Sequence, residues 1–209
     1  MIKSSKFIVF EGIDGAGKTT QINLLANSLR ERGIDCFVTA EPTALPSVKL
    51  LRRALKGDIP ATPMEMAEMF AKDRVNHNID ENEGIGKKLS EGTTVITDRY
   101  YYSSLAYQGS ELGFDVVSKL NLENPDIRTP DLCVFLDLTP EVSLKRIGAR
   151  ENVPHEIYEN YDYLQKTRKT FFDVFEKLRQ RGERIVIIDA SGNVEEIAAR
   201  ILSAVVEIF

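Results

Sequence analysis

The chain has 209 residues, 43% of them hydrophobic, which suits one domain with a substantial core. Its net charge of -5 and its pI near 5.3 disfavour polynucleotide substrates, because sequence-independent nucleic-acid binding needs a basic surface. The sequence contains no apolar run of the roughly 18 residues that a membrane span needs, so we expect a cytoplasmic protein that does not bind membranes.

The first predicted elements enclose a phosphate-binding loop. Residues 6–11 (KFIVFE) read as a buried strand, and residues 19–33 read as a helix that stops at Gly33. Between them, GIDGAGKTT fits the pattern G-x-x-x-x-G-K-[ST], in which backbone N–H groups and a helix N-terminus bind phosphate oxygens. We therefore expect a loop that binds a nucleotide rather than a turn that binds nothing. The nucleotide-binding candidates in the loop are Gly12, Ile13, Asp14, Gly15, Ala16, Gly17, Lys18, Thr19 and Thr20.

Strand-like runs recur along the chain and alternate with helical patterns. This alternation predicts an α/β fold, with a five-stranded, mostly parallel sheet covered by helices on both faces. Thr62 and Glu65 form a predicted capping box at a helix start, and Thr139 with Pro140 resembles a second start. We find no repeat or linker, so residues 1–209 are interpreted as one domain. The strand-like runs are 7–10, 35–40, 93–98, 131–138 and 184–190.

Isolated cysteines and histidines give little sign of a disulfide or a metal site. Cys36 and Cys133 lie far apart in predicted strands, and we expect two buried thiols. His77 and His155 are too few and too isolated to suggest zinc.

Two aspartates at strand ends are candidates for holding Mg²⁺ together with Thr19. Asp98 ends its strand and is followed by Arg99, whereas Asp137 lies inside the run VFLDL. Ligands of such sheets bind at the carboxyl ends of the strands. We favour Asp98, because the polar and aromatic segment DRYYYSSLAYQG begins there.

Taken together, five segments resemble the thymidylate kinase family of P-loop nucleoside monophosphate kinases. The segments are FEGIDGAGKTT, EPT at 41–43, FAKDR at 70–74, DRYYYSSLAYQG at 98–109 and PDLCVFLDLTPEVSLKR at 130–146. The resemblance covers essentially the whole chain. It implies the three-layer P-loop NTPase fold with a short lid at about 146–160, transfer of phosphate from ATP to dTMP with Mg²⁺, and a homodimer.

The resemblance also implies roles for individual residues. Asp14 would face the acceptor and bind its 3′-hydroxyl, since a carboxylate that pointed into the loop would oppose the triphosphate. Phe70 and Arg74, four apart on one predicted helix, share a face, so Phe70 would stack on the base while Arg74 donates to a thymine carbonyl. The other residues implied to contact base or deoxyribose are Ser103, Ser104, Tyr107 and Gln108.

Cations would surround the phosphates. Lys18 is expected at the β/γ-phosphates, Arg52 and Arg99 at the acceptor phosphate, and Arg146 against adenine. Some relatives carry a catalytic arginine in the loop where this chain has Gly15, so we expect the lid residue Arg150 to take that role. The predicted catalytic residues are Lys18, Arg99 and Arg150.

The chain departs from its relatives at Ala40 and Ala44, where many carry an arginine near the acceptor phosphate. Arg52 and Arg99 would then hold this phosphate between them.

Four alternatives stay open beside a dTMP kinase. A deoxynucleoside kinase has a related fold, and a kinase acting on several pyrimidine monophosphates would use the same site. A nucleotide-binding switch shares the loop, although the sequence contains no Asn-Lys-x-Asp tetrad for guanine. A structural or partner-binding descendant would keep the fold without phosphoryl transfer.

Overall fold

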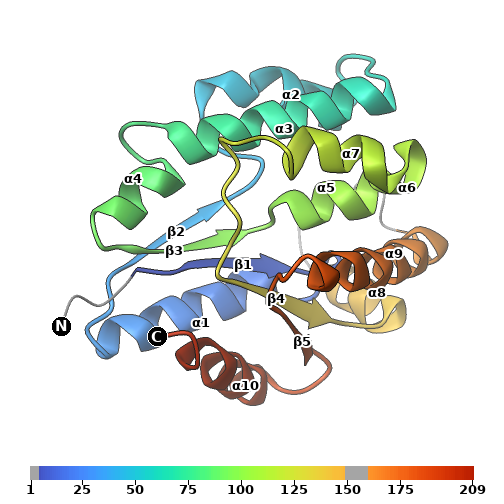
Figure 1. The fold of residues 1–209 in the computed structure, drawn as a ribbon. Helices are drawn as coiled ribbons and strands as arrows, with labels where there is room; N and C mark the ends of the chain where they lie inside the picture. Colours follow the sequence, from blue (N-terminus) through green and yellow to red (C-terminus); the bar gives the residue numbers. More distant parts are fainter. Residues whose placement is uncertain (1–4, 149–159) are drawn as a thin grey trace.

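A computed structural model describes residues 5–148 and 160–209, and in it five parallel strands form one sheet (Figure 1). The order is β2-β3-β1-β4-β5, and each neighbouring pair is parallel, so the predicted α/β fold is confirmed. The strands are β1 (Phe7–Glu11), β2 (Cys36–Ala40), β3 (Thr94–Asp98), β4 (Leu132–Asp137) and β5 (Ile185–Asp189).

Helices cover both faces of the sheet, as Figure 1 shows. Below it in that view lie α1 (Lys18–Glu31) and α10 (Val194–Val206). Above it lie α2 to α7, whereas α8 and α9 lie at the right of the view, near the ends of β1 and β4. The bounds are α2 (Lys49–Leu55), preceded by a 3₁₀ turn η1 (Pro46–Val48), α3 (Pro63–Ile79), α4 (Ile85–Ser90), α5 (Tyr101–Tyr107), α6 (Gly109–Leu112), α7 (Phe114–Asn121), α8 (Pro140–Gly148) and α9 (Tyr161–Gln180).

Alternate residues of each central strand enter separate cores, because successive strand side chains point to opposite faces. Phe7 and Val9 of β1 pack with the aromatic side chains of α5 and α9. Ile8 and Phe10 pack with α1 and α10 instead. Both faces of β1 are therefore buried, as expected for the middle of a three-layer structure.

The phosphate-binding loop lies where the strand order changes direction. β1 pairs with β3 on one side and with β4 on the other, and the loop follows β1 directly. In an open parallel sheet this point leaves a crevice at the carboxyl ends of the strands. The fold thus places residues 12–18 beside the ends of β3 and β4.

The structure tests several smaller predictions. The Thr62 side chain accepts from the Glu65 backbone N–H, while Glu65 accepts from the Thr62 backbone N–H, which confirms the capping box of α3. Cys133 is buried as expected, whereas Cys36 is only partly buried, so the expectation of two buried thiols is wrong for Cys36. Both are free thiols, and burial raises the pKa of Cys36 to about 11. None of the described helices is long and apolar enough to cross a membrane. Arg150, His155 and most of the expected lid at 146–160 lie outside the described residues.

Candidate active site

The loop after β1 is shaped by glycines that no other residue would easily replace. A side chain at Gly12 would place Cβ 2.8 Å from the Leu136 carbonyl oxygen. Gly15 has φ +80°, and a Cβ there would lie 2.9 Å from the Ser143 carbonyl oxygen of α8. Any side chain at position 15 would thus require the loop or α8 to shift.

Lys18 begins α1 and folds back over the loop. Its ammonium donates to the Gly12 carbonyl at 3.2 Å and lies 4.0 Å from Oδ1 of Asp98. Burial lowers the pKa of Lys18, and the nearby Arg99 lowers it further, while Asp98 acts in the opposite direction. Negative phosphate oxygens would favour the charged form, so this lysine suits a phosphate site.

Asp98 and Thr19 lie together at the end of β3. The Thr19 hydroxyl donates to Oδ2 of Asp98 at 3.3 Å. Oδ1 of Asp98 is buried and has no hydrogen-bond partner among the described residues. An oxygen pair of this kind, with one unsatisfied carboxylate oxygen, fits Mg²⁺ held partly through water.

Asp137, the other metal candidate, already forms an ion pair with Arg168. Both of its carboxylate oxygens accept from Arg168, at 2.6 and 2.8 Å. A bidentate pair of this kind is among the stronger side-chain contacts. The geometry therefore favours Asp98, which the sequence interpretation preferred, as the metal candidate.

A cavity of about 480 Å³ opens beside the loop between α2, α3 and α5, with Tyr163 of α9 also at its wall. Its size suits a small-molecule ligand. All nine residues predicted to bind the acceptor line it, although they come from four separate parts of the chain. They are Asp14, Arg52, Phe70, Arg74, Arg99, Ser103, Ser104, Tyr107 and Gln108.

Arg99 crosses from β3 to the loop and pairs with Asp14. Its NH2 group lies 2.5 Å from Oδ1 of Asp14, and its NH1 group donates to the Ser103 hydroxyl at 3.0 Å. Arg99 has φ +70°, a left-handed conformation that is unusual outside glycine. This backbone turn is held by Glu11, a fully buried residue at the end of β1, which accepts from the backbone N–H groups of Tyr100 and Ser103.

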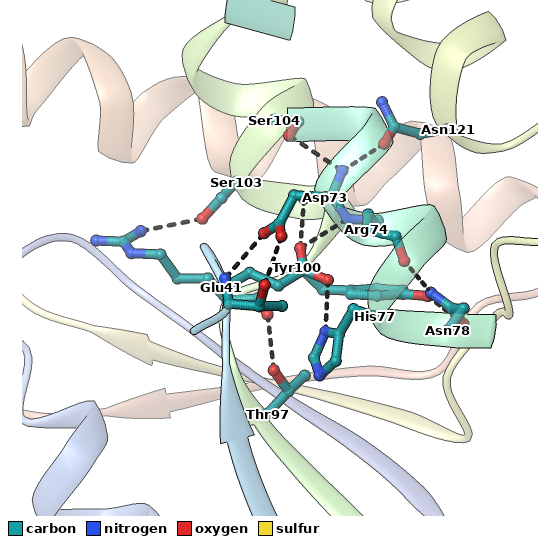
Figure 2. A network of polar contacts seen from close by, with 12 residues as sticks. Glu41, Asp73, Arg74, His77, Asn78, Thr97, Tyr100, Ser103, Ser104 and Asn121 are labelled. Atoms are coloured by element: carbon teal, nitrogen blue, oxygen red, sulfur yellow. Dashed lines mark hydrogen bonds and ion pairs between the residues drawn. The ribbon is translucent and has the colours of Figure 1, made fainter. Parts of the chain in front are cut away.

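Arg74 is held from several sides, as Figure 2 shows. Its Nε and NH2 groups lie 2.8 and 2.7 Å from Oε2 of Glu41. Its NH1 group donates to the Ser104 hydroxyl at 3.2 Å and to Asn121. The guanidinium is 1% exposed yet lines the cavity, so its orientation is fixed before any ligand enters.

The segments EPT and FAKDR interlock at the wall of the cavity. Asp73 accepts from the backbone N–H of Thr43 at 2.8 Å and from its hydroxyl at 2.5 Å. Arg74, the next residue of α3, binds Glu41 at the start of the same loop. Two adjacent side chains of α3 therefore fix the loop after β2.

Arg146 lies elsewhere than the acceptor candidates. It donates to the Ala190 carbonyl at 3.0 Å, which joins α8 to the loop after β5. Its expected contact with adenine stays a prediction.

Sequence reasoning missed several residues of the cavity wall. Lys56 follows Arg52 by four residues, and this helical spacing is a signal that was available. Glu41, Glu111 and Tyr163 carried no such signal, because their positions depend on the packing of α6, α9 and the loop after β2.

The sequence was also compared with protein families and with known proteins. The sequence model of the thymidylate kinase family matches residues 10–201. The chain belongs to the thymidylate kinase family. Among relatives in this family, a probable thymidylate kinase of Methanococcus aeolicus is 39% identical over 206 residues, which cover 97% of each chain.

Two further relatives give the same result. A probable thymidylate kinase of Thermococcus onnurineus is 37% identical over 207 residues, or 95% of this chain and 96% of the relative. A thymidylate kinase of Leptospira interrogans is 38% identical over 176 residues, or 84% of each chain. Family membership therefore extends over the loop, the sheet and the cavity wall.

Proposed function

We propose that the protein transfers the γ-phosphoryl group of ATP to dTMP and so forms dTDP. The single observation that carries this proposal is the cavity beside the phosphate-binding loop, whose wall brings together all nine predicted acceptor residues. Membership of the thymidylate kinase family and the names of its relatives support it.

In this proposal the two substrates lie on either side of Asp14. ATP occupies the loop 12–20, with Lys18 at its β/γ-phosphates and Arg146 near its base. Within the cavity, Phe70 stacks on thymine and Arg74 donates to a thymine carbonyl. Ser103, Ser104, Tyr107 and Gln108 surround the base and the deoxyribose.

Charge and alignment supply the rate enhancement. A phosphate monoester has a second pKa near ~6, so the acceptor is mostly dianionic at neutral pH and needs no general base. Lys18 and Arg99 neutralise charge on the transferred group and hold the two phosphates in line. Arg150 would add a third cation from the lid. Mg²⁺, held by Thr19 and Asp98, would neutralise charge on the ATP phosphates.

Tyr107 adds a specificity element to the same wall. Burial raises the pKa of its phenol to about 12, so the hydroxyl stays protonated at neutral pH. It lines the cavity beside Arg99, whose guanidinium carbon lies 5.5 Å from the ring centroid. This buried hydroxyl has no hydrogen-bond partner among the described residues, so it is available to a ligand in the cavity.

One panel of acceptors tests the proposal against its alternatives. With ATP and Mg²⁺, dTMP should be the best acceptor among dTMP, thymidine, dUMP, dCMP and UMP. Preference for thymidine would indicate a deoxynucleoside kinase, and equal use of the monophosphates a broader pyrimidine kinase. GTP hydrolysis without transfer would indicate a switch.

The Lys18→Ala variant is the control for this panel. It removes a charge-assisted contact to the leaving phosphoryl group, so turnover should fall at least 100-fold while folding is little changed. A Lys18→Ala enzyme with near-normal turnover would contradict the assignment of the loop. The proposal also includes that the protein is a homodimer and is located in the cytoplasm. Light scattering of the purified protein tests whether it is a dimer.

A further inference from the structure

His77 lies behind the acceptor cavity and does not line it, but it contacts Glu41, which does. It belongs to α3, three residues after Arg74, and is 3% exposed. Its ring lies between Thr39 on β2 and Glu41 in the following loop. Figure 2 shows the contact of the ring with Glu41. Sequence analysis treated His77 as an isolated histidine with no metal role, and the function proposed above gives it no role either.

The partners of the ring determine which nitrogen carries the proton. Nδ1 lies 3.0 Å from Oε1 of Glu41, and Nε2 lies 2.9 Å from the Thr39 hydroxyl. A carboxylate can only accept hydrogen bonds, so Nδ1–H donates to Glu41. Nε2 then accepts from the Thr39 hydroxyl, and both ring nitrogens are satisfied in the neutral form.

The two carboxylate oxygens of Glu41 have different partners. Oε1 accepts from His77, while Oε2 accepts from Nε and NH2 of Arg74. The carboxylate therefore cannot turn about its last bond without losing one of these contacts. His77 thus fixes the plane of the carboxylate, and the carboxylate fixes the plane of the Arg74 guanidinium.

The consequence reaches the ligand because the guanidinium of Arg74 lines the cavity. Without a donor from His77, Oε1 of Glu41 would be a buried acceptor that lacks this partner, which is unfavourable. The carboxylate could then turn to place both oxygens on Arg74, and only the NH1 contacts to Ser104 and Asn121 would oppose a rotation of the guanidinium. Arg74 would then present its N–H groups to the base at the wrong angle.

We propose that His77 is a positioning residue of the acceptor site, which orients Arg74 toward the base through Glu41. The inference rests on the proposed function, since it assumes that Arg74 contacts the base of the acceptor. It predicts an effect on the KM for the acceptor and not on the KM for ATP, because the ATP loop lies outside this chain of contacts.

Two matched variants separate positioning from simple structural support. His77→Asn keeps an N–H group near the position of Nδ1, whereas His77→Gln places its amide near Nε2 and leaves Glu41 without the donor. For each variant and the parent we would measure kcat, the KM values for dTMP and ATP, and Tm. The parent enzyme is assayed first. If it does not phosphorylate dTMP, the proposed function is refuted, whereas the contacts from His77 through Glu41 to Arg74 are not.

His77→Gln should raise the KM for dTMP about tenfold, the loss of one charged hydrogen bond, while kcat and the KM for ATP stay within about twofold. His77→Asn should restore most of the loss. A lower Tm with unchanged KM, or equal KM values for the two variants, would overturn the proposal.

Thr39→Val provides a second test if His77→Gln does not fold. It removes the hydroxyl that holds Nε2, so the imidazole ring can turn and its contact with Glu41 is weakened. It should raise the KM for dTMP by a smaller factor, about threefold, with kcat unchanged. An unchanged KM for dTMP in a folded Thr39→Val enzyme would overturn the proposal.

Discussion

Arg52 offers a sharp test of how the acceptor phosphate is held. Its NH2 group donates to the carbonyl oxygens of Pro42 and Thr43, at 2.9 and 2.6 Å. The side chain also lines the cavity. One nitrogen therefore anchors the guanidinium to the loop after β2, and we assign its other N–H groups to the acceptor phosphate.

The size of the effect follows from the contacts that Arg52→Ala would remove. A hydrogen bond to a charged group contributes about 1.5–3 kcal/mol. Loss of the arginine fork should therefore cost about 2 kcal/mol or more in kcat/KM, which is roughly 30-fold at 25 °C. Arg52→Lys should not restore activity, because one ammonium group cannot replace a planar fork that binds two carbonyls and a phosphate.

The assay is steady-state kinetics with varied dTMP at saturating ATP, read through coupled ADP formation. Arg53→Ala is the matched control, since Arg53 is the next residue of α2, carries the same charge and is exposed away from the cavity wall. It should change kcat/KM less than about twofold. A tenfold or smaller loss for Arg52→Ala, or full recovery with lysine, would show that another group holds the phosphate, and Lys56 would be tested next.

Three further predictions concern the sugar, the metal and the lid. Asp14→Ala should raise the KM for dTMP while Tm stays near the parent value, because its ion pair is partly exposed; equal use of 3′-deoxy and normal acceptors by the parent would contradict this role. Asp98→Asn should raise the Mg²⁺ concentration for half-maximal activity, whereas Asp137→Asn should lower Tm without that shift; matching Mg²⁺ curves for Asp98→Asn and the parent would exclude the metal role. Arg150→Ala, outside the described residues, should lower kcat with little change in dTMP affinity; a loss of stability alone would make Arg150 structural.

The fold could be predicted from sequence because its signals are local. The loop 12–20, the five strand-like runs and the capping box at Thr62 each depend on residues close together in the chain. A run of β-branched or aromatic residues between glycines or helical patterns predicts a strand, even when the neighbouring strands are unknown. The family segments are also continuous stretches of sequence, so the resemblance identified nine residues of the cavity wall.

The contacts between these residues could not be predicted, because they join distant segments. Glu41 and His77 are 36 residues apart, and Arg99 and Asp14 are 85 apart. A lone histidine in a helix gives no sign of a buried carboxylate partner. Likewise, the left-handed backbone of Arg99 depends on Glu11, and nothing in DRYYYSSLAYQG alone indicates it.

These contacts explain how three cations remain close together before any nucleotide binds. Lys18 donates to the Gly12 carbonyl, Arg52 to those of Pro42 and Thr43, and Arg99 pairs with Asp14. Each cation thus contacts an oxygen atom of the protein. In our proposal, a phosphate oxygen of a substrate competes with this oxygen for the cation.

Such an arrangement reduces the cost of binding in two ways. The side chains are already ordered, so little rotamer freedom is lost when the ligand enters. Burial disfavours the charged form of Lys18 and lowers its pKa, and the Gly12 carbonyl oxygen offsets part of this effect. Exchange of weaker chain oxygens for doubly charged phosphates then favours the complex, and Asp14, released from Arg99, becomes available to the sugar hydroxyl.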